Sequence, residues 1–385
     1  MLYHLFNWIQ NSGGDFPGIH LMSYLSFRAM LAAVISLIIS LIAGKGIIHW
    51  LQRKQIGETI RDLGLQGQME KKGTPTMGGV IIIISILGSA LLVCNLSSIY
   101  TILLIVTTLW CGALGFTDDY IKVFKHNKEG LSEKKKLIGQ FGLGLLIALA
   151  MCFSTTIQTD SIVTTIPFVK ANEFDYSWLS PFKGQLGVYC TWGIYMIVII
   201  LVITACSNGT NLTDGMDGLS AGTSVIVGLV LGVLAYLGGH VGNASYLNIM
   251  YLPGSGEVAV FMASFVGALL GFLWYNCFPA QVFMGDTGSL TIGGIIGVSA
   301  VLVRKELLLP LLCGIFLMES ASVLIQRYYF KYTRRKYGEG RRVFLMAPLH
   351  HHYQKKGAPE PRIVNRFWII GIILGVATLA LLKIR

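Results

Sequence analysis

The chain has 385 residues, of which 54% are apolar and 13% are charged, and its formal net charge is +11. Soluble domains carry about 25% charged residues, whereas the mean hydropathy of this chain is +0.64. This composition excludes a disordered chain, a disulfide-rich secreted scaffold and an ordinary soluble domain, and it indicates a polytopic membrane protein. In such a protein an excess of positive charge is typical of cytoplasmic loops and does not indicate a nucleic-acid partner.

Ten apolar segments are candidates to cross a lipid bilayer as helices, which takes about 20 residues each. We therefore expect one all-α membrane domain over residues 1–385, with about ten transmembrane helices. An even number of spans places both termini on the same side. In chain order the segments are 24–50, 77–95, 98–117, 137–156, 187–207, 218–238, 257–276, 288–303, 307–328 and 365–383.

Lysine and arginine are concentrated in alternate loops. The loops 51–76, 118–136 and 329–364 carry five, six and nine of them, twenty in all, whereas the opposite face carries seven. The positive-inside rule places the loops richer in lysine and arginine in the cytoplasm. The pattern therefore predicts a membrane protein with both termini on the side opposite to the cytoplasm.

Five aspartates fall on the predicted cytoplasmic face, at or beside helix ends. Asp118 and Asp119 follow the third segment, Asp214 and Asp217 the fifth, and Asp286 the seventh. The last two of these loops contain no lysine or arginine, so their carboxylates repel one another unless a positive group joins them. A divalent cation with oxygen ligands, Mg²⁺ or Mn²⁺, would do so.

The positions of these aspartates allow two further interpretations. Asp214 and Asp217 are three residues apart, so on a helix they would share a face. The alternative is that the Asp-Gly and Asn-Gly pairs are turn and cap residues.

Lysines on the same face supply the counterpart to the acids. Lys71 and Lys72 open the run Lys-Lys-Gly-Thr-Pro-Thr-Met-Gly-Gly before the second segment, and Lys134 begins a triplet before the fourth. Glycine allows a ligand to approach the backbone closely, and lysine binds phosphate. Carboxylates, a metal and lysines together favour a polyphosphate substrate. For any single lysine the alternative is anchoring at the membrane surface.

His350, His351 and His352 are consecutive, so they cannot all face one way, and no cysteine lies nearby to complete a zinc site. We interpret them as a substrate-contacting loop, with an ordinary interfacial loop as the alternative. Glu319 lies inside the ninth segment, where a carboxylate is either functional or hydrogen-bonded and structural.

These motifs, in this order, resemble those of the phospho-N-acetylmuramoyl-pentapeptide transferase (MraY) family. This family belongs to the polyprenyl-phosphate N-acetylhexosamine-1-phosphate transferase superfamily. The resemblance covers nearly the whole chain. Thr-Pro-Thr-Met-Gly-Gly and Pro-Leu-His-His-His-Tyr favour this branch of the superfamily. The segments that carry the resemblance are Lys71–Gly79, Asp118-Asp119, Asn211–Leu219, Phe283–Ser289 and the three-histidine loop.

The resemblance implies that phospho-MurNAc-pentapeptide moves from UDP-MurNAc-pentapeptide to undecaprenyl phosphate, which gives lipid I and UMP in the first membrane step of peptidoglycan synthesis. It further implies Mg²⁺ as cofactor, with Asp286 as principal ligand, and a homodimer. Asp118 and Asp119 are expected to act on the acceptor phosphate, and Asp217 and Phe283 to contact uridine. Further contacts with nucleotide, phosphate or sugar are expected from Lys71, Thr76, Lys134, Asn211, Asp214, Asn276 and His351.

Two other functions are weighed against this one. The first is a sister enzyme with the same chemistry on UDP-N-acetylglucosamine, against which the two branch motifs argue. The second is an ion-coupled transporter, in which acidic residues commonly lie near the bilayer midplane. Here the aspartates cluster at one end, and Glu319 alone is deep. The sequence favours neither a one-step attack nor a covalent aspartyl intermediate.

Overall fold

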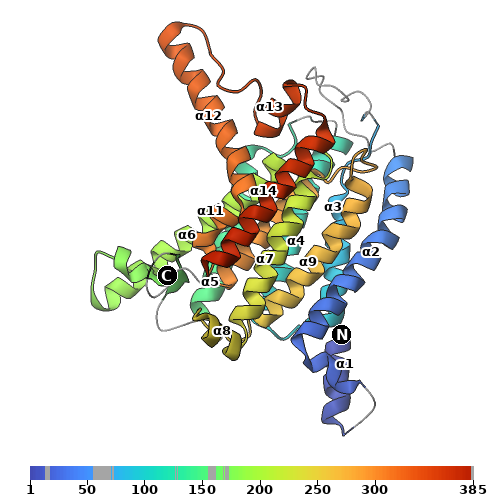
Figure 1. Cartoon of the computed structure of the whole chain (residues 1–385), viewed down its shortest axis with the longest axis vertical. Helices are drawn as coiled ribbons and strands as arrows, with labels where there is room; N and C mark the ends of the chain where they lie inside the picture. The colour runs from blue at the N-terminus through green and yellow to red at the C-terminus, as the bar shows by residue number, and fades with distance from the viewer. Residues whose placement is uncertain are drawn as a thin grey trace.

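The computed structural model describes residues 1–13, 18–54, 71, 73–125, 127, 129–154, 162–167, 169 and 173–382. Lys72, which the sequence places in a phosphate-binding run, lies outside the described residues. The fold is a bundle of helices (Figure 1). In chain order the helices are α1 (Leu2–Asn11), α2 (Leu25–Arg53), α3 (Gly79–Val93), α4 (Ile99–Phe124), α5 (Glu133–Phe153), α6 (Gly184–Thr213), α7 (Leu219–Gly238), α8 (Val241–Leu247), α9 (Gly256–Asn276), α10 (Gly285–Leu302), α11 (Leu309–Leu312), α12 (Gly314–Tyr337), α13 (Leu349–Lys355) and α14 (Glu360–Leu381).

The predicted membrane segments each coincide with a helix. Among the described residues, eight helices are long and apolar enough to span a bilayer, namely α2, α4, α5, α6, α7, α9, α10 and α14. The ninth predicted segment is broken, because the stretch Glu306–Leu312 meets α12 at 77°; counted as one span, it raises the number to nine. α3 has 15 residues, fewer than the roughly 20 that a straight span needs. The polytopic helical architecture is thus confirmed, and the number ten stays a prediction.

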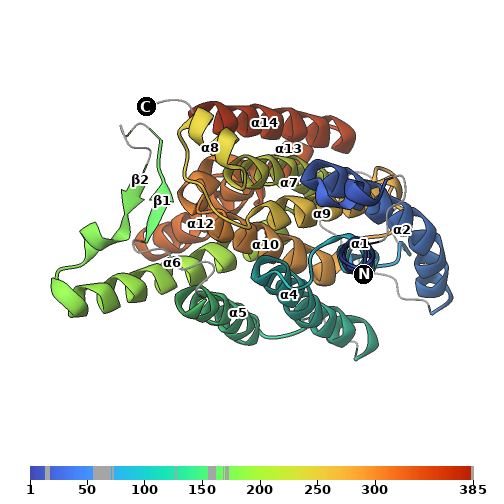
Figure 2. The same ribbon diagram turned by 90° about the horizontal axis from the view of Figure 1, so that it is seen from below.

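α10 is the central helix of the bundle. Its most apolar stretch is 89% buried, and it packs against α3, α4, α6 and α7 (Figure 2). Glycines allow this close packing: a Cβ added to Gly79 would collide with the backbone of Gly288, and one added to Gly115 would collide with the backbone of Asp286. α3 and α4 therefore meet the first turn of α10 almost backbone to backbone.

The two ends of the bundle differ. α1 and the C-terminal end of α14 both lie away from α13, and the outer part of α12 projects away from the other helices near α13 (Figure 1). This projecting part carries exposed aromatic side chains, among them Tyr328 and Tyr332. Tyrosine at such positions is typical of a membrane–water interface.

A short hairpin departs from the all-α prediction. β1 (Val163–Thr165) and β2 (Glu173–Asp175) pair antiparallel. The backbone N–H of Thr165 and the hydroxyl of Thr164 both donate to the carbonyl of Arg304, each at 3.1 Å. The hairpin is therefore fixed to the chain just after α10. Its three-residue strands are too short for the sequence to reveal.

Candidate active site

Three carboxylates converge at the α13 end of the bundle. Asp118 and Asp119 come from the last turns of α4 and Asp286 from the first turn of α10, and one oxygen of each lies within 4.8 Å of the others. The expectation that Asp118 and Asp119 follow their helix is wrong, because α4 continues to Phe124. The ion pair between Asp118 and Lys122, four residues apart at 2.6 Å, supports this polar extension.

Two lysines bridge the carboxylates. Lys122 Nζ lies 2.6 Å from Asp118 Oδ2 and 3.2 Å from Asp286 Oδ2. Lys136, from α5, lies 3.1 Å from Asp118 Oδ1 and also pairs with Asp286. Asp286, whose own loop contains no lysine or arginine, therefore receives its positive partners from α4 and α5. The side chain of Asp118 is fully buried, whereas that of Asp286 keeps 13% of its surface exposed.

Lys134, which the sequence favoured, is exposed, and no ion pair joins it to the cluster in the described part of the chain. α5 begins at Glu133, so Lys136 is turned about 200° from Lys134 around the helix axis. Lys136 and not Lys134 faces the carboxylates. The triplet indicated that a lysine would do so but did not indicate which one.

Asp119 holds the start of α10. Its Oδ1 accepts the backbone N–H of Asp286 at 3.1 Å, and its Oδ2 accepts the N–H and the hydroxyl of Thr287 at 2.8 and 2.6 Å. The first N–H groups of a helix have no partner within the helix, and its N-terminus favours negative charge. Asp119 thus caps α10 from a neighbouring helix and orients Asp286.

The fifth and sixth predicted spans contribute through the turn between them. The Asn211 side-chain amide donates to Asp286 Oδ1 and to Ser289 Oγ, both at 2.9 Å. Asp214 is the C-terminal cap residue of α6. Because α6 ends at Thr213 and α7 begins at Leu219, the expectation that Asp214 and Asp217 share a helix face is wrong.

A second polar group gathers around Lys71. Its Nζ lies 2.6 Å from both Asp217 Oδ1 and Glu360 Oε1, and 6.0 Å from the centre of the Phe283 ring. Glu360 also accepts the backbone N–H of Asp217 at 2.8 Å. The sequence interpretation overlooked Glu360. Its signal was an acid between two prolines where the last helix starts.

Backbone pairing places Phe283 beside the segment that follows Lys71. The N–H of Phe283 donates to Pro75 at 2.8 Å, the N–H of Gly78 donates back to Phe283 at 2.8 Å, and the N–H of Gly79 donates to Met284 at 2.9 Å. These bonds join the glycine-rich run to the start of α10. The two polar groups are therefore parts of one continuous site.

Thr76 and Asn276 occupy buried positions in this region. Thr76 lies against Gly285, where an added Cβ would come within 3.1 Å of its hydroxyl and 2.6 Å of Asp119 Oδ2. The Asn276 Oδ1 accepts the N–H of Gly218 at 3.1 Å, and its amide donates to the carbonyl of Val282 at 2.9 Å. Asn276 thus ties two site loops together.

The three histidines point in different directions, as their spacing required. His350 is fully buried, with Nδ1 3.2 Å from Glu319 Oε2 and its backbone N–H 3.2 Å from Glu319 Oε1. His352 Nδ1 accepts the N–H of Leu345 at 3.1 Å. The ring of His350 packs inside the protein, and its expected contact with substrate stays a prediction. Glu319 is its structural partner, and His351 remains the candidate contact.

Glu319→Ala should destabilise the protein. The substitution leaves the buried backbone N–H of His350 without its acceptor and removes the carboxylate beside its ring, which costs about 1–3 kcal/mol of unfolding free energy. Thermal unfolding in detergent measures this loss, and Glu319→Gln, which keeps one acceptor oxygen, should lose less. An unchanged Tm for Glu319→Ala would contradict the role of this pair.

His351 should stay neutral at physiological pH. Burial, then the neighbouring His350 and the ammonium groups of Lys71 and Lys355, lower the pKa of His351 to about 4 from 6.5. Between pH 6.5 and 4, His351 therefore binds a proton in the unfolded chain but not in the folded protein. The free energy of unfolding falls as the pH drops through this window. We expect the Tm of the wild type to fall more steeply over this range than that of His351→Gln. Parallel pH profiles would refute this assignment.

Comparison with known proteins agrees with this site. Residues 101–304 match the family described as Glycosyl transferase family 4, and residues 71–83 match the Phospho-N-acetylmuramoyl-pentapeptide-transferase signature 1. Full-length relatives are the phospho-N-acetylmuramoyl-pentapeptide-transferases of Parabacteroides distasonis (54% identical), Flavobacterium psychrophilum (53%) and Porphyromonas gingivalis (49%). Each alignment covers 100% of both chains.

The helical bundle with its carboxylate and lysine cluster thus defines a membrane-embedded transferase of glycosyl transferase family 4. The signature lies over Lys71 and the glycine-rich run that pairs with Phe283. The chain belongs to the phospho-N-acetylmuramoyl-pentapeptide-transferase family.

Proposed function

We propose that this protein transfers phospho-MurNAc-pentapeptide from UDP-MurNAc-pentapeptide to undecaprenyl phosphate, releasing UMP and forming lipid I. The observation that carries the proposal is the Asp118–Lys122–Lys136–Asp286 cluster beside the Lys71 group, in a chain aligned end to end with named transferases. Both reactants carry phosphate, so the reaction brings negative groups together, and a site rich in lysine suits it.

We infer that the site faces the cytoplasm and that both termini lie in the periplasm of the inner membrane. The lysine- and arginine-rich loops support this orientation, as does the position of α1 and of the C-terminal end of α14 away from α13 (Figure 1). A soluble nucleotide donor and a lipid phosphate can meet at such an end. The homodimer and the tenth span stay predictions.

Mg²⁺ fits the carboxylate cluster. Three aspartates offer oxygen ligands within 4.8 Å of one another, which suits a hard cation. We propose Asp286 as its main ligand, because this side chain is the most exposed of the three, with Asp118 beside it. Asp119 is engaged by α10 and holds Asp286 in place. When bound, the ion supplies positive charge that lowers the repulsion between phosphates.

The other residues of the site have separate proposed roles. Lys122 and Lys136 bridge the carboxylates, and both can turn toward phosphate oxygens. Lys71, Asp217 and Phe283 form the proposed nucleotide subsite, where the aromatic ring can stack on a base. Asn211 orients Asp286 through its amide. Thr76, Asp214 and His351 stay proposed contacts with substrate.

The test is UMP release by the purified protein in detergent, with UDP-MurNAc-pentapeptide, undecaprenyl phosphate and Mg²⁺. We expect release that requires all three and stops with EDTA. Release with UDP-N-acetylglucosamine alone would move the protein to the sister reaction. Absence of release from folded protein with either donor would overturn the transferase proposal.

Asp118→Asn should lower turnover more than metal affinity. Asp118 is buried and holds both lysines, so its loss disturbs their positions while leaving Asp286 in place. We expect kcat to fall by about 100-fold or more, with little change in the Mg²⁺ concentration at half-maximal rate. A large shift in that concentration would instead make Asp118 a principal ligand.

A further inference from the structure

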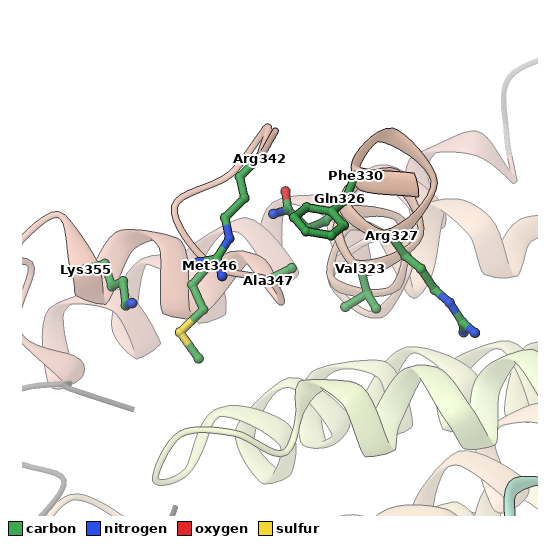
Figure 3. A pocket seen from close by; sticks show the side chains of 8 residues that line it. All are labelled: Val323, Gln326, Arg327, Phe330, Arg342, Met346, Ala347 and Lys355. Carbon is green, nitrogen blue, oxygen red and sulfur yellow. The ribbon is translucent and has the colours of Figure 1, made fainter. Parts of the chain in front are cut away.

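An open cavity of about 550 Å³ lies between α12 and the chain from Arg342 to Lys355 (Figure 3). One side of it is apolar, formed by Val323, Phe330 and Met346. The proposed functions of the site do not use this cavity. Its volume lies within the range of pockets that bind small organic ligands.

The polar lining of the cavity is cationic. Arg327, Arg342 and Lys355 line it, and no aspartate or glutamate does among the residues that the structure describes. Within the described chain, none of these three cations forms an ion pair. Arginine and lysine bind carboxylates through charge-assisted hydrogen bonds. The cavity therefore fits a ligand that is both anionic and partly apolar.

The cavity wall is preformed. Gln326 Oε1 accepts the backbone N–H groups of Val343 at 3.1 Å and Phe344 at 2.9 Å. His352 holds the N–H of Leu345 on the other side. A wall fixed before binding reduces the entropy that a ligand must overcome.

α13 joins this cavity to the nucleotide subsite. His351 and Lys355 are four residues apart on α13, so they share a face of this helix, and Lys355 lines the cavity. α13 also packs against the turn that carries Asp217, the partner of Lys71, because a Cβ added to Gly215 would collide with the ring of His350. A helix of seven residues is about 10 Å long at 1.5 Å per residue. An extended pentapeptide reaches about 17 Å, so a ligand held at Lys71 can extend past His351 into the cavity.

We propose that this cavity binds the peptide portion of the donor. Arg342, Lys355 and Arg327 receive its carboxylates, and the apolar side packs against its side chains. This inference rests on the proposed function, since that function supplies a donor with a pentapeptide. The cavity is thereby a specificity site, separate from the residues that act on phosphate.

The experiment compares equilibrium binding of two donors, UDP-MurNAc-pentapeptide and peptide-free UDP-MurNAc, with Mg²⁺ and without lipid acceptor. For Arg342→Gln and Lys355→Gln we expect the Kd of the pentapeptide donor to rise about tenfold. The Kd of the peptide-free donor should stay within twofold of the wild type. Arg335→Gln, an exposed arginine of α12 outside the lining, is the matched control and should change neither value.

Other outcomes would overturn the inference. An equal rise in Kd for both donors would place the two cations at the nucleotide or would reveal general damage. Unchanged Kd values for both donors would remove peptide binding from the cavity. A raised KM for undecaprenyl phosphate with unchanged donor binding would assign the cavity to the lipid phosphate. Failure of the proposed function would give a different result, because in that case the wild-type protein itself would release no UMP.

Discussion

Asp286→Asn should abolish UMP release, lowering kcat/KM by about 1,000-fold or more, while the protein still folds. The amide keeps the shape of the side chain but loses the charge that pairs with Lys122 and Lys136. Asp286 is also the carboxylate that is most exposed and therefore most able to take a cation from solution. Both the lysines and the metal lose their common partner in this variant.

The measurement is UMP release over a series of Mg²⁺ concentrations, with thermal unfolding in detergent to establish the fold. Asp175→Asn is a matched control, since Asp175 caps a short 3-10 helix at the hairpin, outside the carboxylate cluster. It should retain the wild-type rate. Equal Mg²⁺ affinity in wild type and Asp286→Asn would refute the metal role, and full activity would remove Asp286 from the site.

Asp119→Ala should reduce both activity and stability. The change removes three hydrogen bonds from the first turn of α10, which costs about 1–3 kcal/mol of unfolding free energy. Because Asp286 is the second residue of that helix, we expect kcat to fall by about 100-fold. Asp119→Asn keeps one acceptor and should lie between wild type and alanine.

If Asp119 acts by holding the start of α10, its variants should lose activity and stability together. Thermal unfolding and UMP release measured on the same preparations should decline together through the series wild type, Asp119→Asn and Asp119→Ala. Thr287→Val, which removes the hydroxyl that donates to Asp119, should show a smaller decline in both. A wild-type Tm combined with complete inactivity would instead give Asp119 a direct chemical role.

The sequence was informative where one local pattern decides the outcome. Apolar runs with polar ends predicted the long helices, because a bilayer demands long apolar segments, but not the short helices α1, α8 and α13. It was less informative where helices extend beyond the apolar part. Asp118 and Lys122 stabilise each other one turn apart, so α4 continues beyond its apolar part, and hydropathy alone does not detect this.

For the site, the sequence identified the aspartates but not their partners. Lys136 and Glu360 reach the site through the packing of α5 and α14, and no spacing along the chain encodes such contacts. The histidine run had the same weakness. Its spacing predicted that the three rings point in different directions, but not that His350 would pack in the interior beside Glu319.

Substitutions around the central helix α10 and substitutions at the edge of the bundle have different consequences. Gly79 and Gly115 leave no room for a side chain between their helices and the first turn of α10, so the reacting groups sit on a scaffold that resists variation. The outer part of α12, by contrast, projects from the bundle (Figure 1), where altered side chains disturb few neighbours. Substitutions in the outer part of α12 can therefore change which donor is bound, while the residues that act on phosphate stay the same.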